Sequence, residues 1–90
     1  MANKELTAIF EQIADLLEIT GADPFRVNSY RKAARSIDDL TEAVADLAAT
    51  DRLKEIPGIG KSTSEKIIQY IRTGRVDLHQ ELLASVPKGL

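Results

Sequence analysis

The chain has 90 residues, 43% hydrophobic and 29% charged, proportions typical of one small folded domain. It has no cysteine and one histidine, which excludes a disulfide framework and a thiolate metal site, so we expect no zinc site. No apolar run reaches the length of a membrane span, and the N-terminus lacks the apolar region of a signal peptide. These features predict a cytoplasmic protein with no membrane partner.

The charge is segregated along the chain. The net charge of −2 and the isoelectric point near 5.3 argue, taken alone, against binding to nucleic acid. Residues 1–25 hold one basic and five acidic residues, and residues 36–51 hold five acidic residues and no basic one. Residues 26–35, by contrast, hold four basic residues and no acidic one, and residues 52–75 hold six basic and two acidic residues. If the two basic segments share a face, that face can bind phosphate.

Hydrophobic periodicity predicts four or five helices and no strand, and two of these helices fill the first half of the chain. The first has Asn3 as a candidate cap and Gly21 as its stop, and the second begins with the cap Asp23 followed by Pro24. The apolar residues at helical spacing in these two helices are Leu6, Ile9, Phe10, Ile13, Leu16, Leu17, Phe25, Tyr30, Ala33, Ala34, Ile37 and Leu40.

Three shorter helical stretches are expected in the second half. Thr41 is a candidate cap for the third, which is broken near residues 50–51. The fourth covers residues 62–73 and ends at Gly74, and Asp77 is a candidate cap for the last. Ile67, Ile68 and Ile71 are expected to point inward, and the apolar residues of the other two stretches are Val44, Leu47, Leu53, Leu78, Leu82 and Leu83.

The segment from residue 53 to residue 61 predicts a helix-hairpin-helix, placed at about residues 47–73. Its turn contains Gly58 and Gly60, which permit positive φ and close approach of the backbone to a ligand. Backbone N–H groups at the start of the next helix favour an anion, so we expect the glycines and Lys61 to contact a DNA phosphate. Ile56 and Ile59 are expected to anchor the turn in the core. Phosphate contacts carry no base information, so the predicted binding is independent of sequence.

A plain helix–helix corner, which also favours glycine and proline, is the alternative for this segment. A P-loop for nucleoside triphosphates is excluded, because the spacing Gly-x-x-x-x-Gly-Lys is absent and no parallel sheet is expected.

The order and spacing of several motifs resemble the lyase-type domain of DNA polymerase beta and its relatives, the family X DNA polymerases. The central motifs are residues 28–34 (Asn-Ser-Tyr-Arg-Lys-Ala-Ala), residues 56–61 (Ile-Pro-Gly-Ile-Gly-Lys) and residues 65–67 (Glu-Lys-Ile). The starts at residues 3–6 and 23–26, and the end Val86-Pro87-Lys88-Gly89-Leu90, look more like the bacterial and archaeal members. The resemblance covers essentially all 90 residues.

This resemblance implies a compact all-α bundle of four to five short helices with one helix-hairpin-helix. It also implies a role in base excision repair, in which the domain grips the 5′-phosphate side of gapped or nicked DNA. A monomer is expected, in the nucleoid of a bacterial or archaeal cell, with polymerase domains following in a longer natural chain. No cofactor is required, but the family implies a K⁺ or Na⁺ ion at the hairpin, held by the backbone carbonyls of Lys54, Ile56 and Ile59.

The resemblance also implies roles for individual residues. Lys66 stands where the family has the lysine that forms a Schiff base with the sugar aldehyde of a 5′-deoxyribose phosphate. Arg26 and Ser62 replace two phosphate-binding lysines of the family. Tyr30 matches a tyrosine near the phosphate pocket, and Phe25 stands at the position of a base-stacking histidine. Arg31 and Lys32 belong to the basic segment, and we expect phosphate contact from at least one of its members.

Several of these assignments have a simpler alternative. Lys66 can be an ordinary solvated lysine, Tyr30 a core aromatic residue, and Phe25 a buried contact at the start of its helix. His79 has no predicted partner and is expected at the surface. The acidic side chains of the first helix are expected to face solvent.

Three functions therefore remain open. The first is a DNA-binding module, the second a 5′-deoxyribose-phosphate lyase that uses Lys66, and the third a protein-interaction domain that does not bind DNA.

Overall fold

The computed structural model describes residues 2–85, in which the chain forms five α-helices, one 3-10 turn and no strand. The elements are α1 (Ala2–Ile19), α2 (Pro24–Asp38), α3 (Val44–Ala49), the turn η1 (Leu53–Glu55), α4 (Lys61–Thr73) and α5 (Asp77–Ser85). The all-α prediction is confirmed. Among the described residues, no helix is both long and apolar enough to cross a membrane. The motif at residues 86–90 lies outside the described part.

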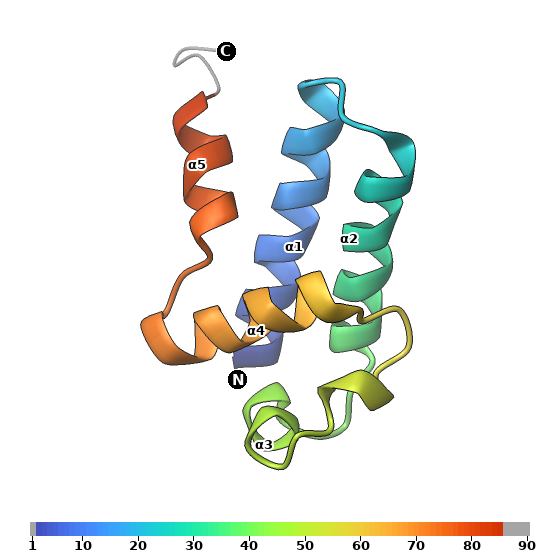
Figure 1. Cartoon of the computed structure of the whole chain (residues 1–90), viewed down its shortest axis with the longest axis vertical. Helices are drawn as coiled ribbons and strands as arrows, with labels where there is room; N and C mark the ends of the chain where they lie inside the picture. Colours follow the sequence, from blue (N-terminus) through green and yellow to red (C-terminus); the bar gives the residue numbers. More distant parts are fainter. Residues whose placement is uncertain (1, 86–90) are drawn as a thin grey trace.

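Helix α1 lies at the centre of the arrangement (Figure 1). It packs on α2, which runs antiparallel to it, and on α5, which lies along its other side. Helix α4 crosses these helices, and α3 lies beyond it at the end where α1 begins. The hairpin between η1 and α4 is thereby placed beside the C-terminal half of α2.

The turn between α1 and α2 forms as its sequence predicts. Gly21 has φ +81°, and the N–H of Ala22 returns to the carbonyl of Leu17 at 2.9 Å, which closes the end of α1. The carboxylate of Asp23 accepts the N–H of Phe25 at 2.8 Å, one residue after Pro24. These local signals make α2 reverse direction against α1.

The core is built on one apolar stripe of α1, with residues from every other element packed on it. Phe10 is fully buried and meets Tyr30 edge-on, with ring centroids 5.8 Å apart. Helix α4 enters the core through Thr63, Ile67 and Tyr70, which follow each other at spacings of four and three. The largest fully buried side chains are Leu6, Phe10, Ile13, Ile37, Val44, Ile67 and Val76.

The prediction that Ile68 and Ile71 point inward is wrong. Their exposed fractions are 41% and 37%, whereas Ile67 is completely buried. One residue along a helix is a rotation of 100°, so a core contact centred on Ile67 turns its neighbours toward solvent. Phe25 is likewise not a buried contact, because 84% of its surface is exposed and Val27 takes the core position at the start of α2.

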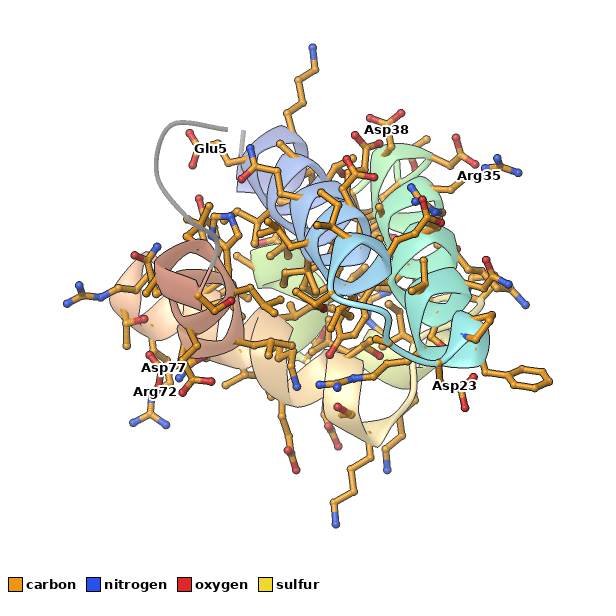
Figure 2. The ribbon with its side chains drawn as sticks, turned by 90° about the horizontal axis from the view of Figure 1, so that it is seen from above. Glu5, Asp23, Arg35, Asp38, Arg72 and Asp77 are labelled. Atoms are coloured by element: carbon orange, nitrogen blue, oxygen red, sulfur yellow. The ribbon has the colours of Figure 1, made fainter. Side chains whose placement is uncertain are left out.

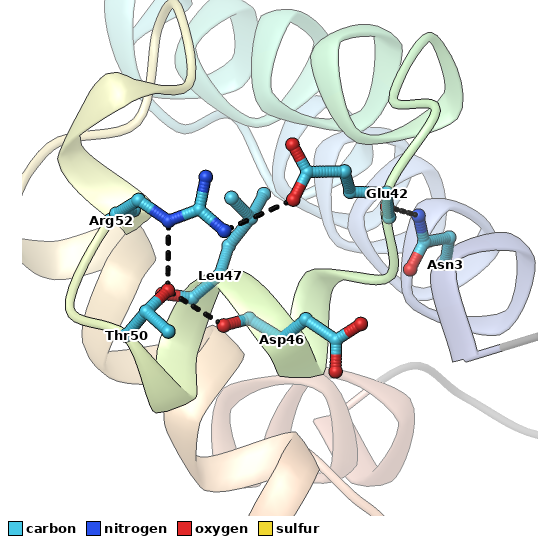
Figure 3. Close-up of polar contacts among 6 residues, drawn as sticks. All are labelled: Asn3, Glu42, Asp46, Leu47, Thr50 and Arg52. Atoms are coloured by element: carbon cyan, nitrogen blue, oxygen red, sulfur yellow. Dashed lines mark hydrogen bonds and ion pairs between the residues drawn. The ribbon is translucent and has the colours of Figure 1, made fainter.

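Asn3 and Thr41 do not cap the helices assigned to them. Helix α1 already includes Asn3, and α3 begins at Val44 after Ala43, whose side chain accepts no capping bond. The side chain of Asn3 instead reaches the start of α3, where its amide oxygen accepts the N–H of Val44 at 2.7 Å. Its amide nitrogen donates to the carbonyl of Glu42, just before α3, at 2.8 Å (Figure 3). Asn3 therefore caps α3 from a distant part of the sequence.

His79 is buried, not at the surface as expected. Only 8% of it is exposed, and its Nε2 lies 2.6 Å from the Oε1 of Gln12 on α1. The amide of Gln69 closes the start of α5, since its oxygen accepts the N–H of Asp77 and its nitrogen donates to the Asp77 carboxylate, both at 2.8 Å. Helix α5 is thus held by one polar contact to α1 and by two hydrogen bonds to Gln69 of α4.

We expect the docking of α5 to weaken as the pH falls. Burial lowers the pKa of His79 below its ordinary value of 6.5, so the undocked ring takes up a proton at a higher pH than the docked ring. The stabilisation is therefore full above about pH 6.5 and is lost as the pH falls below it. Hydrogen exchange of the α5 amides at about pH 7.5 and 5.5, corrected for intrinsic rates, measures the effect.

The variant His79→Gln keeps a polar side chain without this titration, so it should flatten the pH dependence. Equal protection of α5 at both pH values in the unmodified protein would contradict the assignment.

Candidate nucleic-acid interface

The hairpin is an exposed turn held by two buried side chains. Ile56 and Ile59 are 3% and 9% exposed, as predicted, while Pro57, Gly58 and Gly60 lie at the surface. The N–H of Ile59 donates to the carbonyl of Ile56 at 3.2 Å, which closes the turn between the two anchors. The backbone from residue 57 to residue 60 is therefore fixed in position and accessible to a ligand.

Gly58 is required by both conformation and space. Its φ is +81°, and a Cβ at this position would lie 2.8 Å from Cγ of Lys32. The aliphatic part of the Lys32 side chain thus covers this glycine, and it brings the basic segment of α2 against the hairpin. The two basic segments of the chain therefore meet at this contact, which is the condition under which their shared face can bind phosphate.

Gly60 has a different role. Its φ of −104° suits any residue, and a Cβ there would meet no atom within 4 Å. Its own N–H donates to the hydroxyl of Thr63 at 2.8 Å. As the N-cap of α4, however, it has no side chain to accept the N–H groups of the first turn. The start of α4 can therefore offer N–H groups to an anion beside Lys61 and Ser62.

Lys66 extends this surface along α4. Its ammonium donates to the hydroxyl of Ser62 at 3.1 Å and lies 6.0 Å from the centre of the Tyr30 ring. Tyr30 is 3% exposed and belongs to the core, as expected for a core aromatic residue. The Lys66 ammonium thus lies over the face of the Tyr30 ring. Ser62 and Lys66 share one helix face, as their spacing predicts.

The opposite flank of Lys66 is acidic. A depression between α4 and α5 is lined by Lys66 together with the carboxylates of Glu65, Asp77 and Glu81. A phosphate is disfavoured on that flank, so an anion would approach Lys66 from the side of Ser62. The acidic residues of α5 gave no such signal in the sequence, because only the docking of α5 brings them to Lys66.

Phe25 and Arg26 lie exposed in the first turn of α2, about two turns before Lys32. The ring of Phe25 is open to solvent over most of its surface, which leaves its faces accessible for stacking.

Two cations of the basic segments are paired with acids. Arg31 reaches Asp15 at 3.0 Å and Glu18 at 3.4 Å, and its hydrogen bond to Asp15 raises the pKa of the guanidinium further above its ordinary value. Arg52 similarly bonds Glu42 at 3.0 Å and the hydroxyl of Thr50 at 2.8 Å (Figure 3). These pairs are exposed and therefore weak. Arg31 must therefore break its ion pairs with Asp15 and Glu18 before its guanidinium can contact a DNA phosphate.

The two hairpin glycines should respond differently to the same substitution. We expect Gly58→Ser to lower the free energy of unfolding by about 1–2 kcal/mol, because it forces positive φ on a serine and crowds Lys32. Gly60→Ser should leave stability unchanged or raise it, because serine is a favourable N-cap. Urea unfolding of both variants measures the difference, and equal losses at the two positions would contradict the hairpin geometry described above.

Comparisons with known proteins agree with this geometry. A family model described as a helix-hairpin-helix domain matches residues 1–76, which include the hairpin and all of α4. Over all 90 residues the chain is 32% identical to the DNA polymerase/3′-5′ exonuclease PolX of Bacillus subtilis (strain 168). The chain spans 15% of the length of that relative. The resemblance to family X polymerases is thereby confirmed, and the chain belongs to the helix-hairpin-helix domain family.

Proposed function

We propose that this domain binds the phosphate backbone of DNA and grips the 5′-phosphate side of a gap or nick. The observation that carries the proposal is the hairpin itself, in which two buried isoleucines hold an exposed turn at the uncapped start of α4. The family and the polymerase relative support a DNA-binding role.

The side chains around the turn suit a terminal phosphate. The first-turn N–H groups of α4 donate to phosphate oxygens, and Lys61 and Ser62 add a cation and a hydroxyl beside them. A terminal phosphate carries more charge than one within the strand and has an additional free oxygen, so the same donors favour it. The exposed ring of Phe25 offers a stacking surface for an unpaired base.

The backbone carbonyls of Lys54, Ile56 and Ile59 are proposed to hold a K⁺ or Na⁺ ion, as in the family. Carbonyl oxygens are suitable donors for such a cation. The hydrogen bond from Ile59 to Ile56 brings two of these residues into one turn, and a carbonyl oxygen with one hydrogen bond keeps a second lone pair. The residues present thus fit the ion, which would add positive charge beside the bound phosphate.

The test is binding to a duplex with a one-nucleotide gap, with and without the 5′-phosphate, at about 50 and 200 mM salt. We expect tighter binding to the phosphorylated DNA and weaker binding at higher salt. Lys61→Gln should reduce the preference for the 5′-phosphate and lower the slope of log K against log salt by about one.

Lys4→Gln is the matched control, since it removes an exposed lysine of α1 and should leave both measurements unchanged. Absence of binding at low salt would contradict the proposal and favour a protein-interaction domain.

A second candidate function is a 5′-deoxyribose-phosphate lyase, and the observation that favours it is the position of Lys66 beside Ser62. A phosphate held by Ser62 would bring the sugar aldehyde to the Lys66 amine. The amine adds to C1′ and water leaves, which gives a Schiff base. Loss of a C2′ proton then breaks the C3′–O bond and leaves a 5′-phosphate on the DNA.

Borohydride trapping tests this activity, because it reduces the Schiff base to a stable amine. We expect a covalent protein–DNA product from the unmodified chain and from Lys61→Gln at reduced yield, and none from Lys66→Gln. A product that persists in Lys66→Gln, or none from the unmodified chain under conditions in which it binds the DNA, would rule out Lys66 as the nucleophile.

A further inference from the structure

The outward face of α2 carries a surface hollow with a volume of about 570 Å³. One wall is the hairpin residue Pro57, and the floor comes from side chains of α2. Asp39, just after α2, also lines it. The α2 residues that line it are Asn28, Arg31, Lys32, Arg35 and Ser36. We call this surface the α2 hollow.

Its charge suits a polyanion. Arg31, Lys32 and Arg35 lie within about one helical turn and are opposed, among the lining residues, by one carboxylate, that of Asp39. Arg31 is paired with acids of α1, but within residues 2–85 neither Lys32 nor Arg35 forms an ion pair. Figure 2 shows Arg35 pointing outward from α2, whereas Glu5 lies on the far side of α1. The hollow therefore offers two unpaired cations.

The α2 hollow is continuous with the hairpin. The stem of Lys32 covers Gly58 and the same residue lines the hollow, so this side chain stands at the boundary between the hollow and the turn. A ligand that spans both surfaces must carry several negative charges in a row, and the DNA backbone does so. Lys66 and Ser62 lie on α4 and do not line the hollow.

We propose that the α2 hollow is a second contact for the backbone of duplex DNA, next to the phosphate held at the hairpin and separate from the recognition of the 5′-phosphate. This inference rests on the proposed DNA-binding function and adds the course of the duplex, which runs from the hairpin along the outward face of α2. The hollow contributes affinity for any duplex, and the start of α4 contributes the preference for a phosphorylated end.

The experiment uses the full chain and the variants Arg35→Gln and Lys32→Gln, with the gapped duplex in both phosphorylation states over a range of salt. Glutamine keeps Cγ and Cδ, the two Lys32 atoms that lie nearest to Gly58. We expect each variant to weaken binding to both DNAs by the same factor, about threefold or more, and to lower the salt slope by about 0.9. Lys4→Gln, with the same change of charge, should match the unmodified chain, and thermal melting checks that each variant is folded.

The outcomes separate this inference from the function on which it rests. If the unmodified chain binds the gapped DNA and the two variants bind like Lys4→Gln, the α2 hollow does not contact DNA and the proposed function stands. If the variants lose only the preference for the 5′-phosphate, the hollow is the end-binding site and the inference is wrong. If the unmodified chain binds no DNA at low salt, the inference and the proposed function both fail.

Discussion

Helix α1 is the constraint on which the rest of the structure depends. Its apolar stripe is the base of the core, and its polar side chains give each of the other α-helices at least one further contact. In chain order, α1 bonds α3 through Asn3, α4 through Glu5, α5 through Gln12 and α2 through Asp15 and Glu18. The Glu5 carboxylate accepts the hydroxyl of Tyr70 and raises the pKa of that phenol, mainly through this hydrogen bond. Burial of the apolar stripe stabilises the bundle, but it does not specify how each helix is placed, because the hydrophobic effect is non-directional. The polar contacts fix where each helix lies along α1.

The position of the hairpin depends on these contacts between α1 and the other helices. Asn3 holds the start of α3, which leads through η1 to the turn, and Tyr70 and Ile67 hold α4 after it. The turn is thus fixed at both ends by elements that are anchored on α1. Lys32 then covers Gly58 and joins the turn to α2, so the two basic segments of the chain form one surface. A chain with a net charge of −2 can present such a surface because electrostatic attraction acts within about a Debye length, near 8–10 Å at physiological salt.

The parts of this fold that the sequence predicted are those encoded within a few residues. The stop at Gly21, the cap at Asp23 and the buried anchors of the hairpin each follow from local chemistry, as does the pairing of Ser62 with Lys66 one helical turn apart. The errors concern side chains whose environment is set by another helix. Asn3 caps a helix about forty residues away, and His79 is buried because α5 docks on Gln12. The α5 part of the acidic flank of Lys66 was missed for the same reason, since Asp77 and Glu81 reach Lys66 only when α5 lies beside α4.

The pairing of Arg31 with Asp15 and Glu18 links the stability of the bundle to its binding surface. The two acids hold the guanidinium at the edge of the α2 hollow, and their carboxylates occupy the positions that phosphate oxygens would take. An exposed pair of this kind is weak, so its exchange for a phosphate costs little. The same acids repel any DNA that approaches over α1, which leaves the outward face of α2 and the hairpin as the favourable approach. The exposed acidic residues of α1 thus help to hold α2 in place and, by their charge, favour the approach of a polyanion at the hairpin.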